Sequence, residues 1–226
     1  MTTSTSPDAF SPDAFSTDAW MRRFVQSART AKDRLTSLDQ EVGDGDFGVN
    51  LSTGALSTLR HLDANPASGS DPAAPLQAAA TAFLDEVGGT SGPLFGLLFQ
   101  ALAVAVADAE AATTPALAAG AAEGLAAIRR VGDAAPGDKT LVDALGPAAQ
   151  ALRTAPADTP PAEALARAAD AAWAGVSETA RLRARMGRSS YLGERAEGVP
   201  DPGAVGIGLL FASARAVVED LSTRLD

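Results

Sequence analysis

The chain has 226 residues, of which 46% are hydrophobic and only 5% aromatic, and its formal net charge is −10. This length suits one large domain, and an alanine-rich core with few aromatic residues favours closely packed helices. The negative charge argues against sequence-independent binding to nucleic acid or to an anionic membrane. The absence of cysteine excludes disulfides and thiolate metal sites. No secretory signal is visible, so we expect a cytoplasmic protein.

The first twenty residues contain a short tandem, SPDAF, SPDAF and STDAW, at positions 6–20. We expect residues 1–17 to form a flexible leader, because chain termini are usually mobile. The last copy should supply the N-cap of the first helix, since Ser, Thr and Asp are preferred there. Alternatively, Phe10 and Phe15 dock on a partner or on the surface of the domain. Residues 18–226 are then expected to form a single domain.

Apolar residues recur at spacings of three and four along the rest of the chain, which predicts consecutive helices. The expected helices span 18–40, 48–63, 76–87, 94–110, 116–131, 138–153, 161–183 and 203–224. Proline and glycine fall between these segments, and no alternating strand of five or more residues is present. The apolar run at 94–110 should be a buried helix, too short to span a membrane. The sequence therefore predicts an all-α domain of about eight helices.

Four carboxylates crowd into the segment LDQEVGDGDFG, which covers residues 38–48: Asp39, Glu41, Asp44 and Asp46. Asp39 should lie in the last turn of the first helix, and the two glycines that follow allow Asp44 and Asp46 to fold back toward it. These three groups would repel one another unless a cation joins them, and oxygen ligands of this kind suit Mg²⁺ or Ca²⁺. Glu41 is expected to point elsewhere. An acidic turn in which Asp44 and Asp46 only cap the next helix fits the segment equally well.

Two glycine-rich segments are further candidates for phosphate binding. GGTSGP (88–93) directly precedes a helix, where small residues and free N–H groups attract anions; an ordinary loop with Ser91 as the cap is the alternative. GDAAPGDKT (132–140) resembles a Walker A loop, but Asp138 separates the glycine from the lysine and a helix precedes it, which excludes a P-loop. There we expect a helix-initiating turn capped by Asp138.

The segment RLRARMGRSSYLGER (181–195) places five arginines in an otherwise acidic protein. Arginine binds phosphate and carboxylate through two parallel hydrogen bonds. A functional role is more plausible for Arg188 and Arg195, which flank a Gly/Ser/Tyr loop, than for Arg181 and Arg183. The one histidine, His61, lies in a polar stretch, so catalysis by a Ser–His–Asp triad is not expected.

Taken together, these segments resemble the nucleotide-binding (L) subunit of dihydroxyacetone kinases. The family pattern L-D-x-x-I-G-D-x-D-H-G-x-N is matched at 38–50, and its later motifs are matched by GGTSGPLFG (88–96), GDKTLVDAL (137–145) and GRSSYLGERAEGVPDPGA (187–204). The four matches occur in the family's order, from about residue 20 to the C-terminus. One position departs from the pattern, because Phe47 stands where the family usually has histidine.

The resemblance implies a barrel of eight antiparallel helices with ADP or ATP bound at one end. It further implies that Asp39, Asp44 and Asp46 hold two magnesium ions, with Lys139 and Asp143 in supporting roles. The residues expected to border the nucleotide are Phe47, Asn50, Gly89, Thr90, Ser91, Gly137, Arg188, Asp201, Pro202 and Gly203.

The same resemblance implies partners for this chain. In the family, dihydroxyacetone or a similar small ketose is bound by a histidine of a separate K subunit, and some relatives are recharged by a phosphohistidine protein of the phosphotransferase system, the M subunit. The sequence leaves the choice between ATP and such a donor open. It also leaves open a non-catalytic, nucleotide-binding module that acts as a regulator through protein partners.

Overall fold

The computed structural model describes residues 15–65, 71–191 and 196–225. Phe10 and Arg195, for which roles were considered, lie outside these ranges. In the described residues all regular secondary structure is helical. The helices are α1 (Thr17–Val42), α2 (Phe47–Ala64), α3 (Ala74–Glu86), α4 (Ser91–Asp108), α5 (Thr114–Gly132), α6 (Val142–Thr154), α7 (Pro161–Thr179), the 3₁₀ helix η2 (Arg188–Tyr191), α8 (Pro202–Ala212) and the short α9 (Ser222–Leu225).

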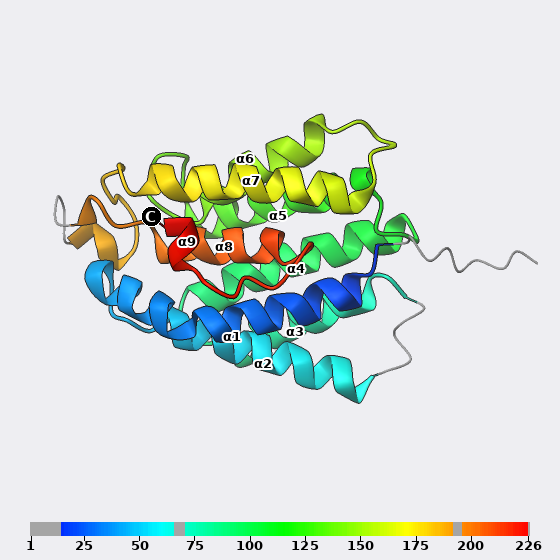
Figure 1. Ribbon diagram of the computed structural model, residues 1–226, viewed down its shortest axis with the longest axis horizontal. Helices are drawn as coiled ribbons and strands as arrows, with labels where there is room; N and C mark the ends of the chain where they lie inside the picture. Colours follow the sequence, from blue (N-terminus) through cyan, green and yellow to red (C-terminus); the bar gives the residue numbers. More distant parts are fainter. Residues whose placement is uncertain (1–14, 66–70, 192–195, 226) are drawn as a thin grey trace, which may run out of the picture.

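The helices α1 to α8 form an antiparallel barrel. Each packs mainly against its neighbours in the sequence, and α8 closes the ring by packing against both α7 and α1. In Figure 1 the C-terminal ends of α1 and α7 and the N-terminal ends of α2, α4 and α8 lie together at the left-hand end. The predicted all-α fold with eight antiparallel helices is therefore confirmed.

Helix α8 is the most completely buried element, because almost every side chain from Pro202 to Phe211 is apolar and enclosed. Two of its glycines make this possible. A Cβ on Gly206 would lie 2.8 Å from Cζ of Phe95 and 2.9 Å from Cζ of Phe47, and one on Gly208 would lie 3.0 Å from the indole of Trp173. Aromatic rings of other helices thus pack directly on the backbone of α8. This close packing allows α8 to lie in the interior of the barrel.

Helix α4 is the predicted apolar helix, and its 18 residues make it long and apolar enough, by length and composition, to cross a membrane. The expectation that this run is too short for that was wrong. Its burial was predicted correctly for one face, because Phe95, Phe99 and Leu102 are at most 1% exposed and the helix packs between α3 and α5.

The N-terminal cap of α1 was predicted correctly. The Ser16 hydroxyl accepts a hydrogen bond from the Ala19 N–H at 3.1 Å. Phe15 packs against the core, with its ring centroid 5.8 Å from that of Trp20. Of the two alternatives for this phenylalanine, docking on the domain itself is the one the structure supports.

The last predicted helix, 203–224, is wrong in its C-terminal half, because α8 ends at Ala212. Side chains of α1 satisfy the backbone groups beyond that point: the Arg23 guanidinium donates to the carbonyls of Ser213 and Ala214 at 2.7 and 2.6 Å, and the Ser27 hydroxyl accepts from Val218 N–H at 2.9 Å. The chain then turns back along α8 as a strap between α1 and α7 (Figure 1). These contacts join residues about 190 positions apart, so local periodicity could not reveal them.

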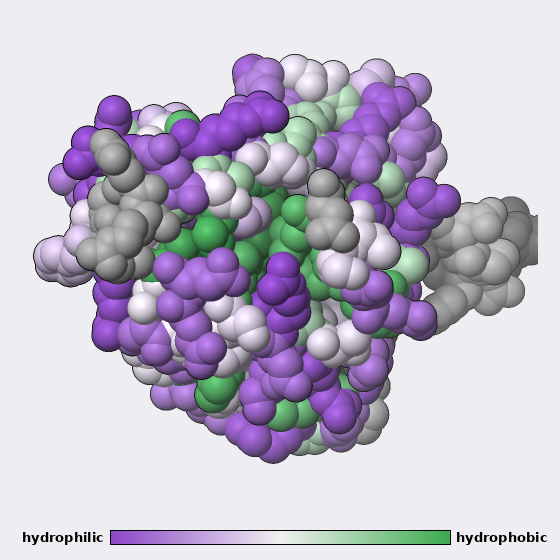
Figure 2. Space-filling model, turned by 60° about the vertical axis from the view of Figure 1, so that its left-hand side comes forward, coloured by the Kyte–Doolittle hydropathy of each residue, from purple (hydrophilic) through white to green (hydrophobic). Residues whose placement is uncertain are grey.

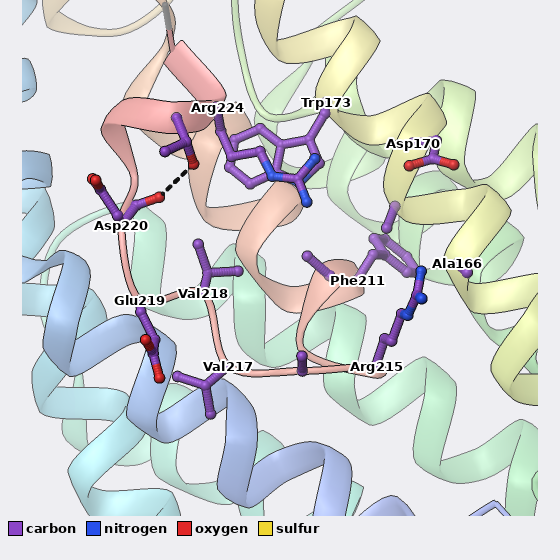
Figure 3. Close-up of a pocket in the computed structure, with 14 residues that line it drawn as sticks. Ala166, Asp170, Trp173, Phe211, Arg215, Val217, Val218, Glu219, Asp220 and Arg224 are labelled. Carbon is purple, nitrogen blue, oxygen red and sulfur yellow. Dashed lines mark hydrogen bonds between the residues drawn. The ribbon is translucent and has the colours of Figure 1, made fainter.

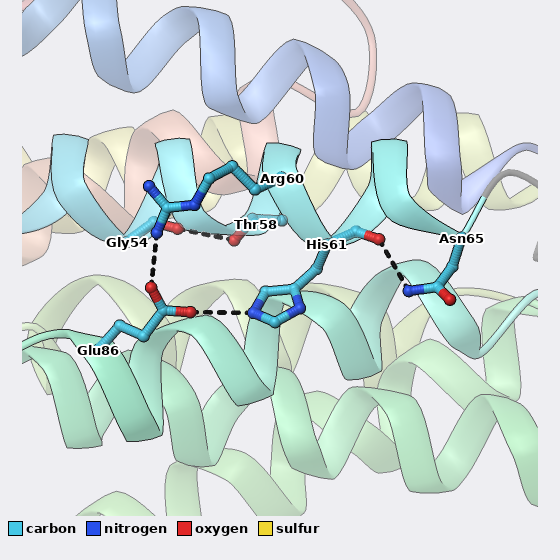
Figure 4. A network of polar contacts seen from close by, with 6 residues as sticks. All are labelled: Gly54, Thr58, Arg60, His61, Asn65 and Glu86. Atoms are coloured by element: carbon cyan, nitrogen blue, oxygen red, sulfur yellow. Dashed lines mark hydrogen bonds and ion pairs between the residues drawn. The ribbon is translucent and has the colours of Figure 1, made fainter.

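His61 lies on α2, where Figure 4 shows it in a polar network with α3. Its Nε2 is 2.9 Å from Oε1 of Glu86, whose other oxygen is 2.6 Å from Nη2 of Arg60. The side chain of His61 thus links two helices at the surface.

The packing of aromatic rings on Gly206 predicts that a larger residue at this position destabilises the protein. Gly206→Ala places a methyl group against Phe47 and Phe95, and overpacking of this kind costs about 1–3 kcal/mol. The matched control is Gly146→Ala in α6, where a Cβ meets nothing within 4 Å and helix propensity should stabilise the protein by about 0.5–1 kcal/mol. Urea unfolding of both variants measures the difference, and equal stability of the two would contradict this account of α8.

Candidate metal and nucleotide site

The three aspartates expected to bind metal converge at one end of the barrel. Asp39 lies in the last turn of α1, while Asp44 and Asp46 lie in the connection to α2. One carboxylate oxygen from each residue lies within 4.8 Å of the others. The turn depends on glycine, because Gly45 has a φ of +79° and a Cβ on Gly43 would lie 2.3 Å from Oδ1 of Asp39. The backbone geometry thus brings the three carboxylates together, as the spacing predicted.

The alternative in which these aspartates only cap α2 is not what the structure shows. Asp46 occupies the N-cap position, but its side chain makes no capping hydrogen bond. Instead, Oδ2 of Asp39 accepts the Phe47 N–H at 3.0 Å, and Asp44 forms an ion pair with Arg188. Glu41 is exposed and outside the cluster, as expected.

The electrostatics of the cluster suit a cation. Asp39 is only 9% exposed, and burial raises the pKa of its carboxyl, with smaller contributions from the negative charges of Asp44 and Asp46 and an opposing one from the Phe47 N–H. Mg²⁺ is bound in proteins by oxygen ligands such as carboxylates, and its charge would offset the repulsion among these three groups. The residues present therefore fit a hard divalent ion.

The N-terminus of α4 forms a second wall of the site. Thr90 is its N-cap residue and makes no side-chain cap bond, and Ser91 is the first helical residue, so the alternative of an ordinary loop capped by Ser91 is not what the structure shows. Gly89 has a φ of +74°, a conformation that favours glycine. Because the first N–H groups of a helix lack helical partners, this wall offers donors and a positive dipole end to an anion.

The third wall of the site contains Asp201 and Lys139. Oδ2 of Asp201 accepts the Ala204 N–H at 2.7 Å and so caps α8; burial raises the pKa of this carboxyl to about 7, although the Ala204 N–H and the charge of Lys139 oppose the shift. The Lys139 ammonium is buried and donates to the carbonyls of Thr179 and of Val199, the latter at 2.6 Å. Lys139 thereby ties the end of α7 to the segment that leads into Asp201.

Helix α6 has no side-chain cap, because its N-cap residue is Leu141, so the expectation that Asp138 caps this helix was wrong. Asp138 accepts the Ala135 N–H at 2.8 Å, whereas Asp143 accepts from Gly137 at 2.5 Å and from Thr140 at 2.9 Å. Because these bonds hold residues 137–140 in a turn, α6 begins at Val142 and not at residue 138.

A cavity of about 310 Å³ connects the three walls. Of the predicted nucleotide-binding residues, those that line it are Phe47, Gly89, Thr90, Ser91, Arg188, Asp201, Pro202 and Gly203. Asn50 and Gly137 are not among the lining residues: Nδ2 of Asn50 would be 3.5 Å from a Cβ on Gly89, and Gly137 belongs to the turn before α6. Figure 2 shows a hollow on this side of the molecule with hydrophobic residues at its centre and hydrophilic ones around it.

The sequence did not identify the apolar lining of the cavity, which includes Leu94, Ile128, Leu141, Val142 and Met186. Leu94, Ile128 and Val142 lie on helices and cannot be told from core residues by pattern alone. Leu141 and Met186 lie in connecting segments, to which helical periodicity does not apply. All five give the cavity an apolar part in addition to the carboxylates, which is the combination that a ligand with a flat apolar part and a charged part requires.

A second groove lies between α7 and the C-terminal strap, where Figure 3 shows Arg224 over the ring of Trp173. Its lining mixes three acidic residues, Asp170, Glu219 and Asp220, with Arg215 and Arg224. Among the described residues its carboxylates form no converging cluster of three, and the one helix that begins there, α9, has only four residues. The cavity at the barrel end is therefore the better candidate for a metal and a polyphosphate.

An antiparallel helical barrel with this fold occurs in the dihydroxyacetone kinase of C. freundii. The structure of that enzyme in complex with AMP-PNP and Mg²⁺ matches 94% of this chain and 37% of the longer chain, with a TM-score of 0.60 and 26% identity. The DAK2 domain family matches residues 41–216. The chain belongs to this family.

Its curated relatives include kinase subunits of similar length. It is 37% identical over 172 residues to PEP-dependent dihydroxyacetone kinase 2, ADP-binding subunit DhaL, of Listeria innocua, covering 76% of this chain and 80% of the relative. It is 34% identical to the corresponding subunit of Escherichia coli, covering 83% and 89%. D-erythrulose kinase of Mycolicibacterium smegmatis is 36% identical, but the match spans only 32% of that protein.

The raised pKa of Asp39 makes a prediction for the metal-free protein. The folded-state pKa lies above the unfolded value, so the charge of Asp39 opposes folding increasingly as the pH rises above about 4. Asp39→Asn should therefore be more stable than the parent chain at pH 7 in a chelator, and the difference should shrink toward pH 4. Urea titrations at several pH values measure this, and a destabilised variant at pH 7 would contradict the account.

Phe47 makes a second prediction, because its ring is 7% exposed and packs near Phe95, with ring centroids 6.3 Å apart. Phe47→His restores the usual family residue but buries a polar ring against Gly206, which should cost about 1–3 kcal/mol. Urea unfolding measures the cost. If nucleotide affinity and turnover in a reconstituted kinase assay stay unchanged, Phe47 is a packing residue; a change in either would show that this position tunes the site.

Proposed function

We propose that this chain is the ADP- or ATP-binding, magnesium-dependent phosphotransferase subunit of a dihydroxyacetone kinase. It would transfer a phosphoryl group to dihydroxyacetone, or to a similar small ketose, held by a separate K subunit. The observation that carries this proposal is the convergence of Asp39, Asp44 and Asp46 opposite the N-terminus of α4, within one cavity. The relatives named as ADP-binding subunits support it.

Charge balance supports the proposal of two magnesium ions. The three carboxylates carry up to −3, and two dications would leave a net +1 that attracts a polyphosphate. Bound magnesium would neutralise phosphate oxygens and bridge them to the protein.

The protein's own part in the reaction is alignment. The carboxylates fix one side of the polyphosphate site, and the free N–H groups at the start of α4 donate to phosphate oxygens. Leu94, Ile128 and Met186 provide apolar surface for the remainder of the nucleotide and exclude water. Phosphoryl transfer depends mainly on such positioning and charge neutralisation, so a general base from this chain is not needed.

A partner subunit follows from the same reasoning. The one histidine of the chain, His61, is held by Glu86 on the surface between α2 and α3, and it does not line the cavity. We therefore place the ketose on a K subunit and propose that the two proteins meet in the cytoplasm. An M subunit that recharges retained ADP is the donor we would test first, because two of the relatives quoted above are named as PEP-dependent.

The test of nucleotide binding is calorimetry with ADP. We expect binding that requires Mg²⁺ and is lost in Asp44→Asn and in Asp46→Asn, because each change removes one charged ligand. Glu41→Gln is the matched control, since it removes a carboxylate from the same segment but outside the cluster, and it should bind as the parent chain does. No affinity for ADP or ATP in the presence of magnesium would refute the proposal.

The phosphoryl donor and the catalytic role need two further measurements. Native mass spectrometry of freshly purified protein should show retained ADP if an M subunit is the donor, and an empty site if exchangeable ATP is. Kinase activity after mixing with a cognate K subunit tests catalysis. Persistent inactivity in a complex that does form would instead favour a regulatory nucleotide-binding module.

A further inference from the structure

Arg188 already neutralises part of the acidic cluster. Its Nη1 forms an ion pair with Oδ2 of Asp44, at the exposed edge of the site. Among the described residues, this is the one ion pair that involves Asp39, Asp44 or Asp46. Lys139, the other cation that lines the cavity, points its ammonium at the carbonyls of Thr179 and Val199 instead. In the part of the chain that the structure describes, Arg188 is therefore the one basic side chain that forms an ion pair with the cluster.

The backbone of Arg188 is held close to the end of α1. Arg188 begins the 3₁₀ helix η2, and the hydroxyl of the next residue, Ser189, donates to the carbonyl of Val42 at 2.6 Å. Val42 is the last residue of α1, three positions after Asp39. The side chain itself is 68% exposed, against 32% for Asp44, so the guanidinium can change partner while its backbone stays anchored.

We propose that Arg188 is an exchangeable counter-cation: it pairs with Asp44 when the site holds no metal, and on metal and nucleotide binding it leaves Asp44 and pairs with the phosphates. This inference rests on the proposed function. Its first half follows from electrostatics, because a metal held by Asp39, Asp44 and Asp46 would bring a second positive charge to the carboxylate that pairs with Arg188. A guanidinium and a dication at the same carboxylate repel each other at close range.

The second half follows from where the released side chain lies. Arg188 lines the same cavity as Thr90 and Ser91 at the start of α4, so phosphate drawn to that helix end comes within reach of a guanidinium. Arginine binds phosphate oxygens in a bidentate manner more strongly than it binds an exposed single carboxylate. Exchange of Asp44 for phosphate is thus favourable once a metal has neutralised the aspartates.

The exchange predicts that removal of the Arg188 side chain raises the affinity for metal and lowers the affinity for nucleotide. A purely structural role would not produce effects of opposite sign. Arg188→Ala removes a competitor, so Mn²⁺ alone, as a probe for the metal site, should bind about two- to fivefold more tightly, the range set by an exposed ion pair. The same variant lacks a phosphate ligand, so the magnesium complex of ADP should bind about tenfold more weakly or worse. Arg188→Lys keeps the charge and should lie between the parent chain and Arg188→Ala in both measurements.

The experiment uses the full chain, with electron paramagnetic resonance for free Mn²⁺ and calorimetry for ADP with magnesium. Arg185→Ala is the matched control, because Arg185 comes from the same segment, is 71% exposed, approaches Asp138 at 3.7 Å and does not line the cavity. It should leave both affinities close to those of the parent chain.

Tighter Mn²⁺ binding together with weaker ADP binding in Arg188→Ala alone is the result we expect. Weakening or no change of both affinities would overturn the inference while leaving the proposed function intact. Equal effects in Arg185→Ala would also overturn it, because they would reflect general charge and not exchange at Asp44. Failure of the parent chain to bind ADP with magnesium is a separate outcome that overturns the proposed function, and with it the phosphate half of the exchange.

Discussion

The mutual repulsion of Asp39, Asp44 and Asp46 is the constraint on which the rest of the site depends. Folding alone brings these charges within 4.8 Å of one another, and burial of Asp39 makes its charge still less favourable. The barrel tolerates this because one large apolar core, to which helices α1 to α8 all contribute, stabilises the fold. A stable core can hold the carboxylates together despite their repulsion, and a bound cation would gain affinity by relieving that repulsion.

The geometry of that cluster depends on how closely α1 and α2 approach each other. A Cβ on Gly48 would lie 2.3 Å from the carbonyl oxygen of Lys32, so only glycine allows the first turn of α2 to pack on α1. That approach places the Phe47 N–H against the carboxylate of Asp39 and the Phe47 ring against Gly206 of α8. One contact therefore positions both a carboxylate of the proposed metal site and an aromatic residue that lines the cavity.

Local sequence patterns predicted the parts of this structure that depend on local interactions. Helical periodicity located the eight helices, and the glycine spacing in residues 38–48 predicted that Asp44 and Asp46 return toward Asp39. Contacts between distant segments were not predictable in this way. Three features depend on residues far apart in the sequence: the ion pair of Arg188 with Asp44, the hydrogen bond from Lys139 to the Val199 carbonyl, and the end of α8 at Ala212. The apolar lining of the cavity escaped notice because its helical residues have the periodicity of an ordinary core and Leu141 and Met186 lie in connecting segments.

The most direct test of the central claim is a crystal structure of the chain with ADP and Mn²⁺, with the metal located by its anomalous scattering. The account predicts anomalous peaks bonded to carboxylate oxygens of Asp39, Asp44 and Asp46, with the phosphates between these peaks and the start of α4. A metal bound away from these three residues, or ADP bound in the groove between α7 and the C-terminal strap, would contradict it.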